Sequence, residues 1–295
     1  MKILICGANG QLGRDSAEVL APNHQVVITD VEELDITDRE KVNTYLRRLC
    51  PEIIVNCAAY TRVDACEAQE ALAARINRDG PDNLAQSAQK CGARLIHIST
   101  DYVFDGTKPL PGVYTENDPP HPISAYGRTK LAGEEAVRRA TDRFVILRTA
   151  WLYGIGGPNF LKTILKRAVG DPRRQIRVVN DQFGSPTWSY RLALQIGMLI
   201  ESGGTGLYHA TAEGSCSWYE LADRFLREMN VPHRVVPCPT EAYQTAARRP
   251  KNSILENSRL KAAGIHCMAD WQEDVARYAA RYHDRLLQEA TEEMP

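Results

Sequence analysis

The sequence predicts an α/β protein in which a doubly wound parallel sheet carries a smaller C-terminal lobe. Two observations predict the sheet: short apolar runs alternate with helical patterns up to about residue 150, and the first run leads directly into a glycine-rich turn. Beyond that point the alternation fades, which predicts a separate lobe. We therefore expect residues 1–150 to form the sheet domain and residues 151–295 to form mainly the lobe, with segments that return to the sheet.

The first predicted unit is a strand at residues 2–6, followed by a turn that carries Gly7, Gly10 and Gly13 and by a helix that ends near Leu20. Strand, glycine turn and helix in this order are typical of a dinucleotide-binding Rossmann fold. The glycines let backbone amides at the helix N-terminus approach a pyrophosphate. A glycine-rich turn that binds nothing is the alternative, and the position at the start of an α/β chain favours the binding turn.

The second predicted strand covers residues 25–29 and ends at Asp30. The distance of Asp30 from the glycines is close to that of the carboxylate that binds an adenosine ribose in dinucleotide-binding folds. A turn residue at the surface is the alternative for this aspartate. We expect Asp30 to lie at the adenosine end of a bound dinucleotide.

The next helix and strand follow in the same alternation. Residues 34–38 predict a loop and a capped helix start, and the helix continues to about Leu49. Residues 52–56 then predict the third strand. The small residues at 57–59 come directly after it, where they suit a close approach of the backbone to a ligand.

The fourth predicted strand brings polar side chains to the ligand-binding edge of the sheet. Two helices are expected first, near residues 65–74 and 81–91, with Asn77 between them. The strand at 94–98 then delivers residues 99–103 at its carboxyl end. Open α/β sheets bind their ligands at this edge.

The helix that contains Tyr126 and Lys130 carries the predicted acid–base chemistry. It follows a Gly- and Pro-rich loop at 105–122, and Ser124 is its expected N-cap. Residues four apart share one helix face, so we expect the lysine ammonium to lower the pKa of the phenol. Such a tyrosine exchanges a proton with an oxygen at neutral pH. Taken alone, the pair is more often an ordinary exposed helix face.

The rest of the chain predicts a fifth strand at 144–147 and then the lobe. A short strand is expected at 207–209 and a polar loop at 180–187. Further helices are predicted at 159–169, 190–200, 218–229 and 271–287. We interpret these segments as a lobe that closes over the ligand edge of the sheet.

Composition favours an ordinary cytoplasmic protein. Lys and Arg number 36 against 37 Asp and Glu, so no global charge attracts nucleic acid or a membrane surface. The N-terminal apolar run is too short for a signal peptide, and no stretch reaches the length of a membrane span. The eight cysteines are scattered without Cys-x-x-Cys or Cys/His clusters, which indicates reduced thiols and no metal site.

With these motifs in one chain, the sequence resembles the extended short-chain dehydrogenase/reductases, and within them the reductases of keto-sugar nucleotides. The resemblance covers nearly the whole chain. Besides the glycine turn and residues 34–38, it rests on the segments 58–61 with 63–64, 99–104, 126–130, 151–154, 181–187 and 249–253. It implies a monomer or homodimer that reduces the C4 keto group of dTDP-4-dehydro-L-rhamnose with NADPH or NADH.

The resemblance also implies roles for individual residues. Thr100 hydrogen-bonds the C4 carbonyl, Tyr126 protonates that oxygen, and Lys130 holds the nicotinamide ribose, supported by Asn77 through water. The implied cofactor-binding residues are Gly7, Asn9, Gly10, Gln11, Leu12, Gly13, Asp30, Asp35, Ala58, Ala59, Tyr60, Tyr126 and Lys130. The implied substrate-binding residues are Thr100, Asp101, Tyr102, Trp151, Asn159, Gln182 and Arg249. Core packing is the alternative for Trp151, and Arg248 is the alternative to Arg249 as a phosphate ligand.

Two comparisons within the family narrow the chemistry. Related dehydratases carry an Asp–Glu pair after the threonine, whereas Tyr102 follows Asp101 here, which favours simple reduction. A different class of relative keeps the fold and the Tyr–Lys pair but serves as a regulatory subunit of methionine adenosyltransferase. The reductase loop at 181–187 is intact here and favours the enzyme. Asp30 favours NADH and Arg14 favours NADPH, so we expect both cofactors to be accepted.

Overall fold

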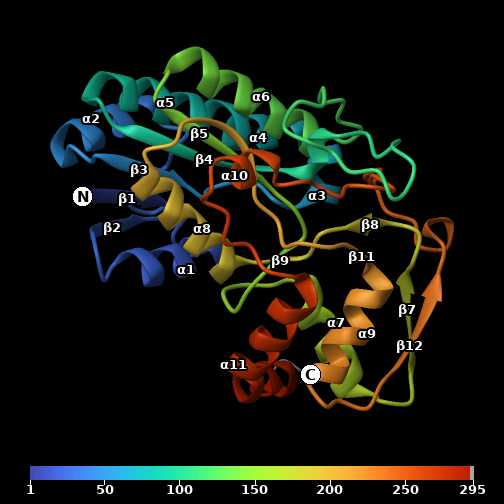
Figure 1. Ribbon diagram of the computed structural model, residues 1–295. Helices are drawn as coiled ribbons and strands as arrows, with labels where there is room; N and C mark the ends of the chain where they lie inside the picture. Colours follow the sequence, from blue (N-terminus) through green and yellow to red (C-terminus); the bar gives the residue numbers. More distant parts are fainter. Residues whose placement is uncertain (293–295) are drawn as a thin grey trace.

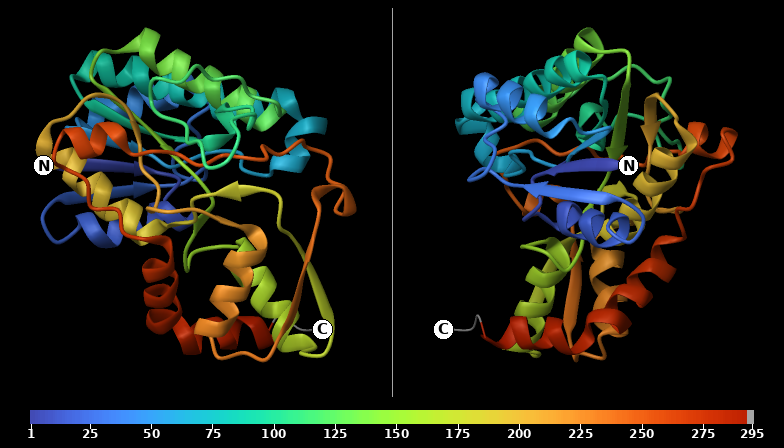
Figure 2. Two further views of the ribbon diagram at one scale, coloured as in Figure 1. Left: turned by 45° about the vertical axis from the view of Figure 1, so that its right-hand side comes forward. Right: turned by 90° about the vertical axis from the view of Figure 1, so that its left-hand side faces the viewer.

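The computed structural model describes residues 1–292, which form a sheet domain and, below it in every view, a smaller lobe (Figures 1 and 2). Six parallel strands make the central sheet in the order β10-β5-β4-β3-β1-β2. Their bounds are Lys2–Cys6 for β1, Gln25–Thr29 for β2, Ile53–Asn56 for β3, Arg94–Thr100 for β4, Phe144–Thr149 for β5 and Gly206–His209 for β10. The predicted fold class is therefore confirmed.

Helices cover both faces of the sheet because successive strand residues point to opposite sides. Ile3 and Ile5 of β1 pack toward α1 and α8, whereas Leu4 and Cys6 pack toward α2, α5 and α6. The helices on the first face are α1 (Gln11–Leu20) and α8 (Ser189–Ser202). Those on the second are α2 (Arg39–Leu49), α5 (Gly80–Cys91) and α6 (Ala125–Ala140).

The segment before α5 differs from the two predicted helices. The chain forms α3 (Val63–Ala68) and α4 (Glu70–Ala74), and a π-helical turn, η1 (Arg75–Asp79), then runs directly into α5. Asn77 lies inside this turn and is fully buried, instead of separating two helices. Wider π turns of this kind are frequent at functional sites because they redirect side chains within a helix.

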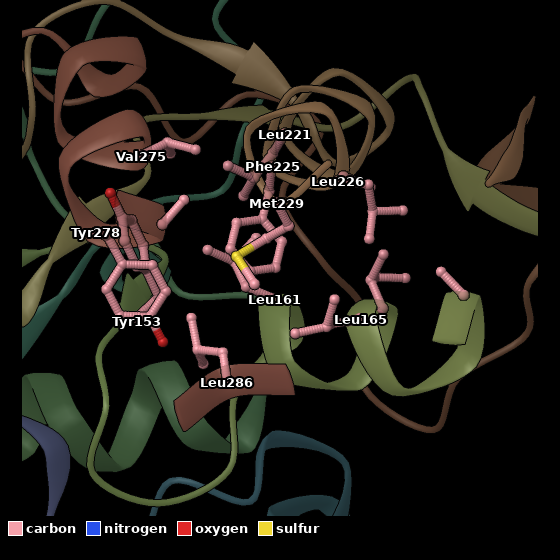
Figure 3. Close-up of a cluster of buried hydrophobic side chains, with 14 of the residues drawn as sticks. Tyr153, Leu161, Leu165, Leu221, Phe225, Leu226, Met229, Val275, Tyr278 and Leu286 are labelled. Carbon is pink, nitrogen blue, oxygen red and sulfur yellow. The ribbon is translucent and has the colours of Figure 1, made fainter. Parts of the chain in front are cut away.

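The lobe consists of α7 (Phe160–Gly170), α9 (Trp218–Glu228), α11 (Trp271–Glu292) and the parallel strand pair β7 (Gln175–Val179) and β12 (Arg234–Cys238). The strand pair was not predicted. Figure 3 shows part of the core, in which Leu161 and Leu165 of α7 face Leu221 and Phe225 of α9 and Tyr278 of α11. The lobe therefore has its own apolar cluster beside those of the sheet.

The chain passes between the two parts several times. After β5 it enters the lobe, returns through α8 to place β10 beside β5, and enters the lobe again at α9. The crossings are marked by two short strand pairs: β6 (Leu152–Tyr153) with β9 (Thr187–Trp188), and β8 (Phe183–Gly184) with β11 (Cys216–Ser217). A last helix on the sheet side, α10 (Ser258–Ala262), contacts β10 before the chain ends in α11.

Across residues 1–292, no helix combines the length and apolar character that a membrane crossing requires.

Candidate active site

A cleft of about 670 Å³ lies where the carboxyl ends of β1, β3, β4 and β5 meet the lobe. Its sheet side is formed by the glycine turn after β1, by Cys57 and Ala59 after β3, and by the end of β4. Its lobe side includes Phe160 of α7 and Trp218 of α9. The cleft therefore occupies the edge at which open parallel sheets bind ligands.

The glycine turn is built for a ligand that approaches the backbone closely. Gly7 has φ of +75°, and a Cβ there would lie 2.6 Å from the amide nitrogen of Ala58. A Cβ on Gly13 would overlap the Gly7 carbonyl oxygen. Gly10, Gln11, Leu12 and Gly13 line the cleft at the N-terminus of α1. Helix N-termini attract anions, so this turn fits the pyrophosphate of a dinucleotide.

Asp30 lies beside the glycine turn, as the spacing predicted. Its two carboxylate oxygens accept hydrogen bonds from the backbone amides of Asn9 and Val31, each at 2.8 Å. Arg14 donates to the Asn9 carbonyl at 3.0 Å, so a cation and a carboxylate flank the same turn. Asp35 lies in the loop before α2, where its carboxylate accepts the Thr37 amide, and it is not one of the cleft-lining residues.

Asn77 holds the segment after β3 in which Ala59 and Thr61 line the cleft. Its side-chain oxygen accepts the Tyr60 amide at 2.8 Å, and its side-chain nitrogen donates to the Tyr60 carbonyl at 3.1 Å. The same nitrogen donates to the hydroxyl of Thr129 on α6 at 3.2 Å. Asn77 thus ties this segment to the helix that carries Tyr126 and Lys130.

Thr100, Tyr126 and Lys130 all line the cleft. Thr100 is the last residue of β4, and the other two lie on α6, whose N-cap Ser124 accepts the Gly127 amide as predicted. The Thr100 hydroxyl acts on the Tyr126 phenol and lowers its pKa, although the effect of burial is larger. The Lys130 ammonium donates to the carbonyl of Ile98 on β4 at 2.6 Å, which anchors it beneath the end of the strand.

The expectation that Lys130 lowers the pKa of Tyr126 is wrong for this structure. Burial removes water from the phenolate and raises the pKa of Tyr126 above its ordinary value, and the charge of Asp101 raises it further. Burial also lowers the pKa of Lys130 to about 8, because the ammonium loses its hydration. The phenol therefore keeps its proton at neutral pH, which is the state that a proton donor needs.

Asp101 and Tyr102 follow Thr100 in a short 3-10 turn, η2 (Asp101–Val103). Asp101 is 2% exposed, and burial raises its pKa to about 6. The ring of Tyr102 meets that of Tyr126 edge to face, with centroids 5.5 Å apart. Two half-buried tyrosines and a buried carboxyl group thus lie around Thr100.

Two aromatic side chains and one amide close the lobe side of the cleft. The indoles of Trp151 and Trp218 are stacked, with centroids 3.6 Å apart and planes 6° from parallel. Asn159 caps α7 by accepting the Lys162 amide, and its side-chain nitrogen donates to the Gln11 side chain at 3.0 Å. Asn159 therefore joins the lobe to the glycine turn.

Gln182 and Arg249 line a smaller neighbouring pocket of about 250 Å³, which shares Phe160 and Trp218 with the main cleft. The Arg249 guanidinium forms two hydrogen bonds with Asp64, at 3.2 and 2.8 Å, and Gln182 donates to the Thr240 hydroxyl at 3.1 Å. Arg248 is exposed and is not one of the pocket's lining residues. This favours Arg249 over its neighbour as the inward-facing arginine.

The sequence analysis missed Trp218, Arg167 and Arg177 as lining residues of these pockets. Arg177 lies on β7, where Ile176 and Val178 are buried and the residues between them are exposed. This alternation over residues 175–179 is the signal that predicts a half-buried strand, and it was hidden by the arginines that precede it. Trp218 was assigned only as the start of a helix.

Residues 1–292 contain no group of three or more His, Cys, Asp or Glu side chains arranged to hold a metal ion. All eight cysteines are free, and burial raises the pKa of Cys57, which lines the cleft, to about 12. A thiol with that pKa stays protonated and is a poor nucleophile. The other polar and titratable side chains at this end of the cleft are Thr100, Asp101, Tyr102, Tyr126 and Lys130.

Comparison with known proteins gives consistent matches. Residues 1–284 match the family described as RmlD substrate binding domain. The dTDP-4-dehydrorhamnose reductase of Burkholderia thailandensis is 40% identical over 290 residues, which cover 92% of this chain and 96% of the relative. The dTDP-4-keto-6-deoxy-D-glucose reductase of Streptomyces niveus is 41% identical over 271 residues, 91% of this chain and 93% of the relative.

A solved structure agrees with these matches in fold. The dTDP-4-dehydrorhamnose reductase of Bacillus anthracis, in complex with NADP, superposes with a TM-score of 0.91 at 41% identity, over 95% of this chain and 99% of that one. A high score over nearly the full length means that the sheet domain and the lobe have the same arrangement in both proteins.

Proposed function

The chain belongs to the RmlD substrate binding domain family, and we propose that it is an NAD(P)H-dependent reductase of the C4 keto group of dTDP-4-dehydro-L-rhamnose. The observation that carries the proposal is the meeting of Thr100, Tyr126 and Lys130 in one cleft with the glycine turn. The names of the relatives, at about 40% identity over most of both chains, support the same reaction. They give no support to the regulatory-subunit alternative.

A dinucleotide fits the sheet side of the cleft. The residues assigned to hold it are Gly7 to Gly13 at the pyrophosphate, Asp30 and Arg14 at the adenosine ribose, and Lys130 at the nicotinamide ribose. When bound, NADPH or NADH supplies the hydride. Asp35 is assigned to the adenosine only through family resemblance, because its carboxylate holds a turn of its own.

Tyr126 is proposed as the proton donor to the C4 oxygen. Its raised pKa keeps the phenol protonated at neutral pH, and the developing alkoxide is a far stronger base than water. Thr100 lines the same cleft as Tyr126 and is assigned to the same oxygen. Lys130, fixed by the Ile98 carbonyl, contributes a positive charge beneath the reacting groups.

The lobe is proposed to bind the nucleotide diphosphate. The smaller pocket combines aromatic walls from Phe160 and Trp218 with guanidinium groups from Arg167, Arg177 and Arg249. Flat rings suit a base, and arginines suit phosphates. Trp151, Asn159 and Gln182 are assigned to the sugar and diphosphate. Binding energy from such remote groups positions the C4 carbonyl in the cleft.

The test is product analysis after incubation with dTDP-4-dehydro-L-rhamnose and NADPH. The expected product is dTDP-L-rhamnose, formed with oxidation of one NADPH for each sugar. Free dTDP should compete with the sugar nucleotide and not with NADPH. Reduction of the free keto sugar at an equal rate would contradict the assignment of the lobe. A mixture of C4 epimers would contradict the assignment of one product.

A further inference from the structure

Asp101 is a buried carboxyl group whose proton the proposed reaction does not yet use. Its Oδ1 accepts a hydrogen bond from the Thr100 hydroxyl at 3.0 Å. Its Oδ2 is buried and has no hydrogen-bond partner within residues 1–292. A buried carboxylate oxygen without a partner is costly, whereas a protonated carboxyl is neutral. The geometry therefore favours a carboxyl group that holds a proton more tightly than an exposed aspartate does.

Thr100 connects this carboxyl group to Tyr126. The Thr100 oxygen accepts the Tyr102 amide at 3.2 Å, and its hydroxyl donates to Asp101 at 3.0 Å. Tyr126 lines the same end of the cleft, and the Thr100 hydroxyl acts on its pKa. A hydroxyl has only one proton to donate. When Asp101 is ionised, Thr100 donates that proton to it. When Asp101 is protonated, it donates to Thr100, and the hydroxyl is free to turn toward Tyr126.

We propose that Asp101 is the proton reservoir for Tyr126 and acts through the Thr100 hydroxyl. The inference rests on the proposed reductase function and adds a residue to it. The Tyr126 O–H bond breaks as an O–H bond forms on the substrate's C4 oxygen. The phenolate then takes the Thr100 proton, and Thr100 takes the Asp101 proton. Asp101 is left as a carboxylate and is protonated again by water, so one proton enters for each turnover.

The surroundings of Asp101 make this transfer favourable. Burial raises its pKa to about 6, and the hydrogen bond from Thr100 acts in the opposite direction. The titratable neighbours are Tyr126 on α6 and Tyr102 on the same turn, while the Asp64–Arg249 pair acts on Tyr102. Lys130, further along α6, is bound to the Ile98 carbonyl. The Tyr126 phenolate is more basic than the Asp101 carboxylate, so transfer of the proton from Asp101 to Tyr126 is favourable.

The first experiment compares the pH dependence of kcat in the wild type and in Asp101→Asn. Wild-type kcat is expected to fall about tenfold per pH unit above the Asp101 pKa, because the reservoir empties. The asparagine amide still donates to the Thr100 oxygen but carries no transferable proton. Its kcat at pH 6 should fall at least about tenfold, and the pH-dependent decline should vanish. A decline that persists in Asp101→Asn overturns the proposal.

Two further variants separate a relay from a structural role. Thr100→Ser keeps the hydroxyl and should keep the decline, whereas Thr100→Val should lose it. If Asp101→Asn does not fold, these variants carry the test. A decline that persists in Thr100→Val contradicts the relay.

A readout without turnover tests the reservoir directly. The ¹³C carboxyl resonance that disappears in Asp101→Asn should titrate near pH 6 in the free protein, and titration near pH 4 overturns the proposal. If the wild type fails to reduce the nucleotide sugar while this resonance titrates near 6, the proposed substrate is wrong and the reservoir stands. If the wild type is active and the decline persists in Asp101→Asn, only the relay is wrong.

Discussion

Two carboxyl groups are buried beneath the end of β4, and their surroundings differ. Glu134 of α6 is fully buried against Arg148, whose guanidinium donates to its two oxygens at 2.8 and 2.7 Å, while Ser99 donates to it at 2.6 Å. Asp101 is 2% exposed, but the Thr100 hydroxyl takes the place of the cation, and one carboxyl oxygen has no partner within residues 1–292. The two carboxyl groups are therefore equally buried, and they differ in whether a cation lies against them.

The difference separates a structural carboxylate from one suited to chemistry. The Glu134 carboxylate, held by the Arg148 guanidinium and the Ser99 hydroxyl, ties α6 to β4 and β5. A buried carboxyl without a cation has its pKa moved into the range where it exchanges protons near neutral pH. Ser99 and Thr100 are adjacent in sequence, yet each serves one of these two carboxyl groups.

The largest effect is expected on the Asp101 side, from Tyr126→Phe. The variant loses one proton donor and little volume, so kcat should fall by ~10²–10⁴-fold while the melting temperature stays close to that of the wild type. The rate of NADPH oxidation with the sugar nucleotide measures kcat, and calorimetry measures the melting temperature. Activity within a few-fold of the wild type would remove Tyr126 as the acid.

The second prediction concerns Glu134, the carboxylate with a structural role, and uses the variant Glu134→Gln. It leaves Arg148 buried without a counter-charge, and removing one partner of a buried pair typically costs ~3–5 kcal/mol of unfolding free energy. Urea unfolding measures the loss. The matched control is Glu135→Gln on the same helix, whose long contact with Arg139 is exposed and should contribute under about 1 kcal/mol. Equal losses in the two variants would contradict the structural role of Glu134.

Asp101→Asn should stabilise the protein at alkaline pH. A folded-state pKa of about 6 exceeds the ordinary value of 3.8, so the wild type has its full stability below about pH 4 and loses part of it as pH rises through 6. The loss amounts to about 3 kcal/mol when complete. The asparagine variant does not titrate there, so its advantage should be present at pH 8 and absent at pH 4. Thermal unfolding at both pH values tests this, and an equal difference at the two is the contradicting result.

The smallest effect is expected on cofactor preference, from Asp30→Ala. Asp30 adds to the comparison a third carboxylate, whose partners are backbone amides. We expect the ratio of kcat/KM for NADPH to that for NADH to rise by up to about tenfold, because a negative charge near a 2′-phosphate is removed. Loosening of the Asn9 amide affects both cofactors and cancels in the ratio. An unchanged ratio would place Asp30 outside the ribose site.

The sheet and the helix that carries Tyr126 and Lys130 were predictable because their signals are local. Apolar runs define β1 to β5, and Ser124 marks the start of α6. The contacts between the lobe and the sheet domain were not predictable in this way, because they join residues far apart in sequence. Arg249, for example, binds Asp64 across 185 residues. The pKa of Tyr126 was misjudged for the same reason: a spacing of four residues brings a lysine near, but desolvation comes from segments distant in sequence. The pair β7–β12 was missed because its strands are short and lie far apart in the chain.

The position of β10 has a consequence for how the protein is made. This strand pairs with β5 along the edge of the sheet, yet residues 206–209 leave the ribosome only after α7, β7 and α8 have been synthesised. Until then β5 presents an unpaired edge, which is a template for aggregation. A fragment that stops near residue 150 retains that edge permanently. We therefore expect a dinucleotide-binding fragment to stay soluble better when it extends through β10 than when it stops near residue 150.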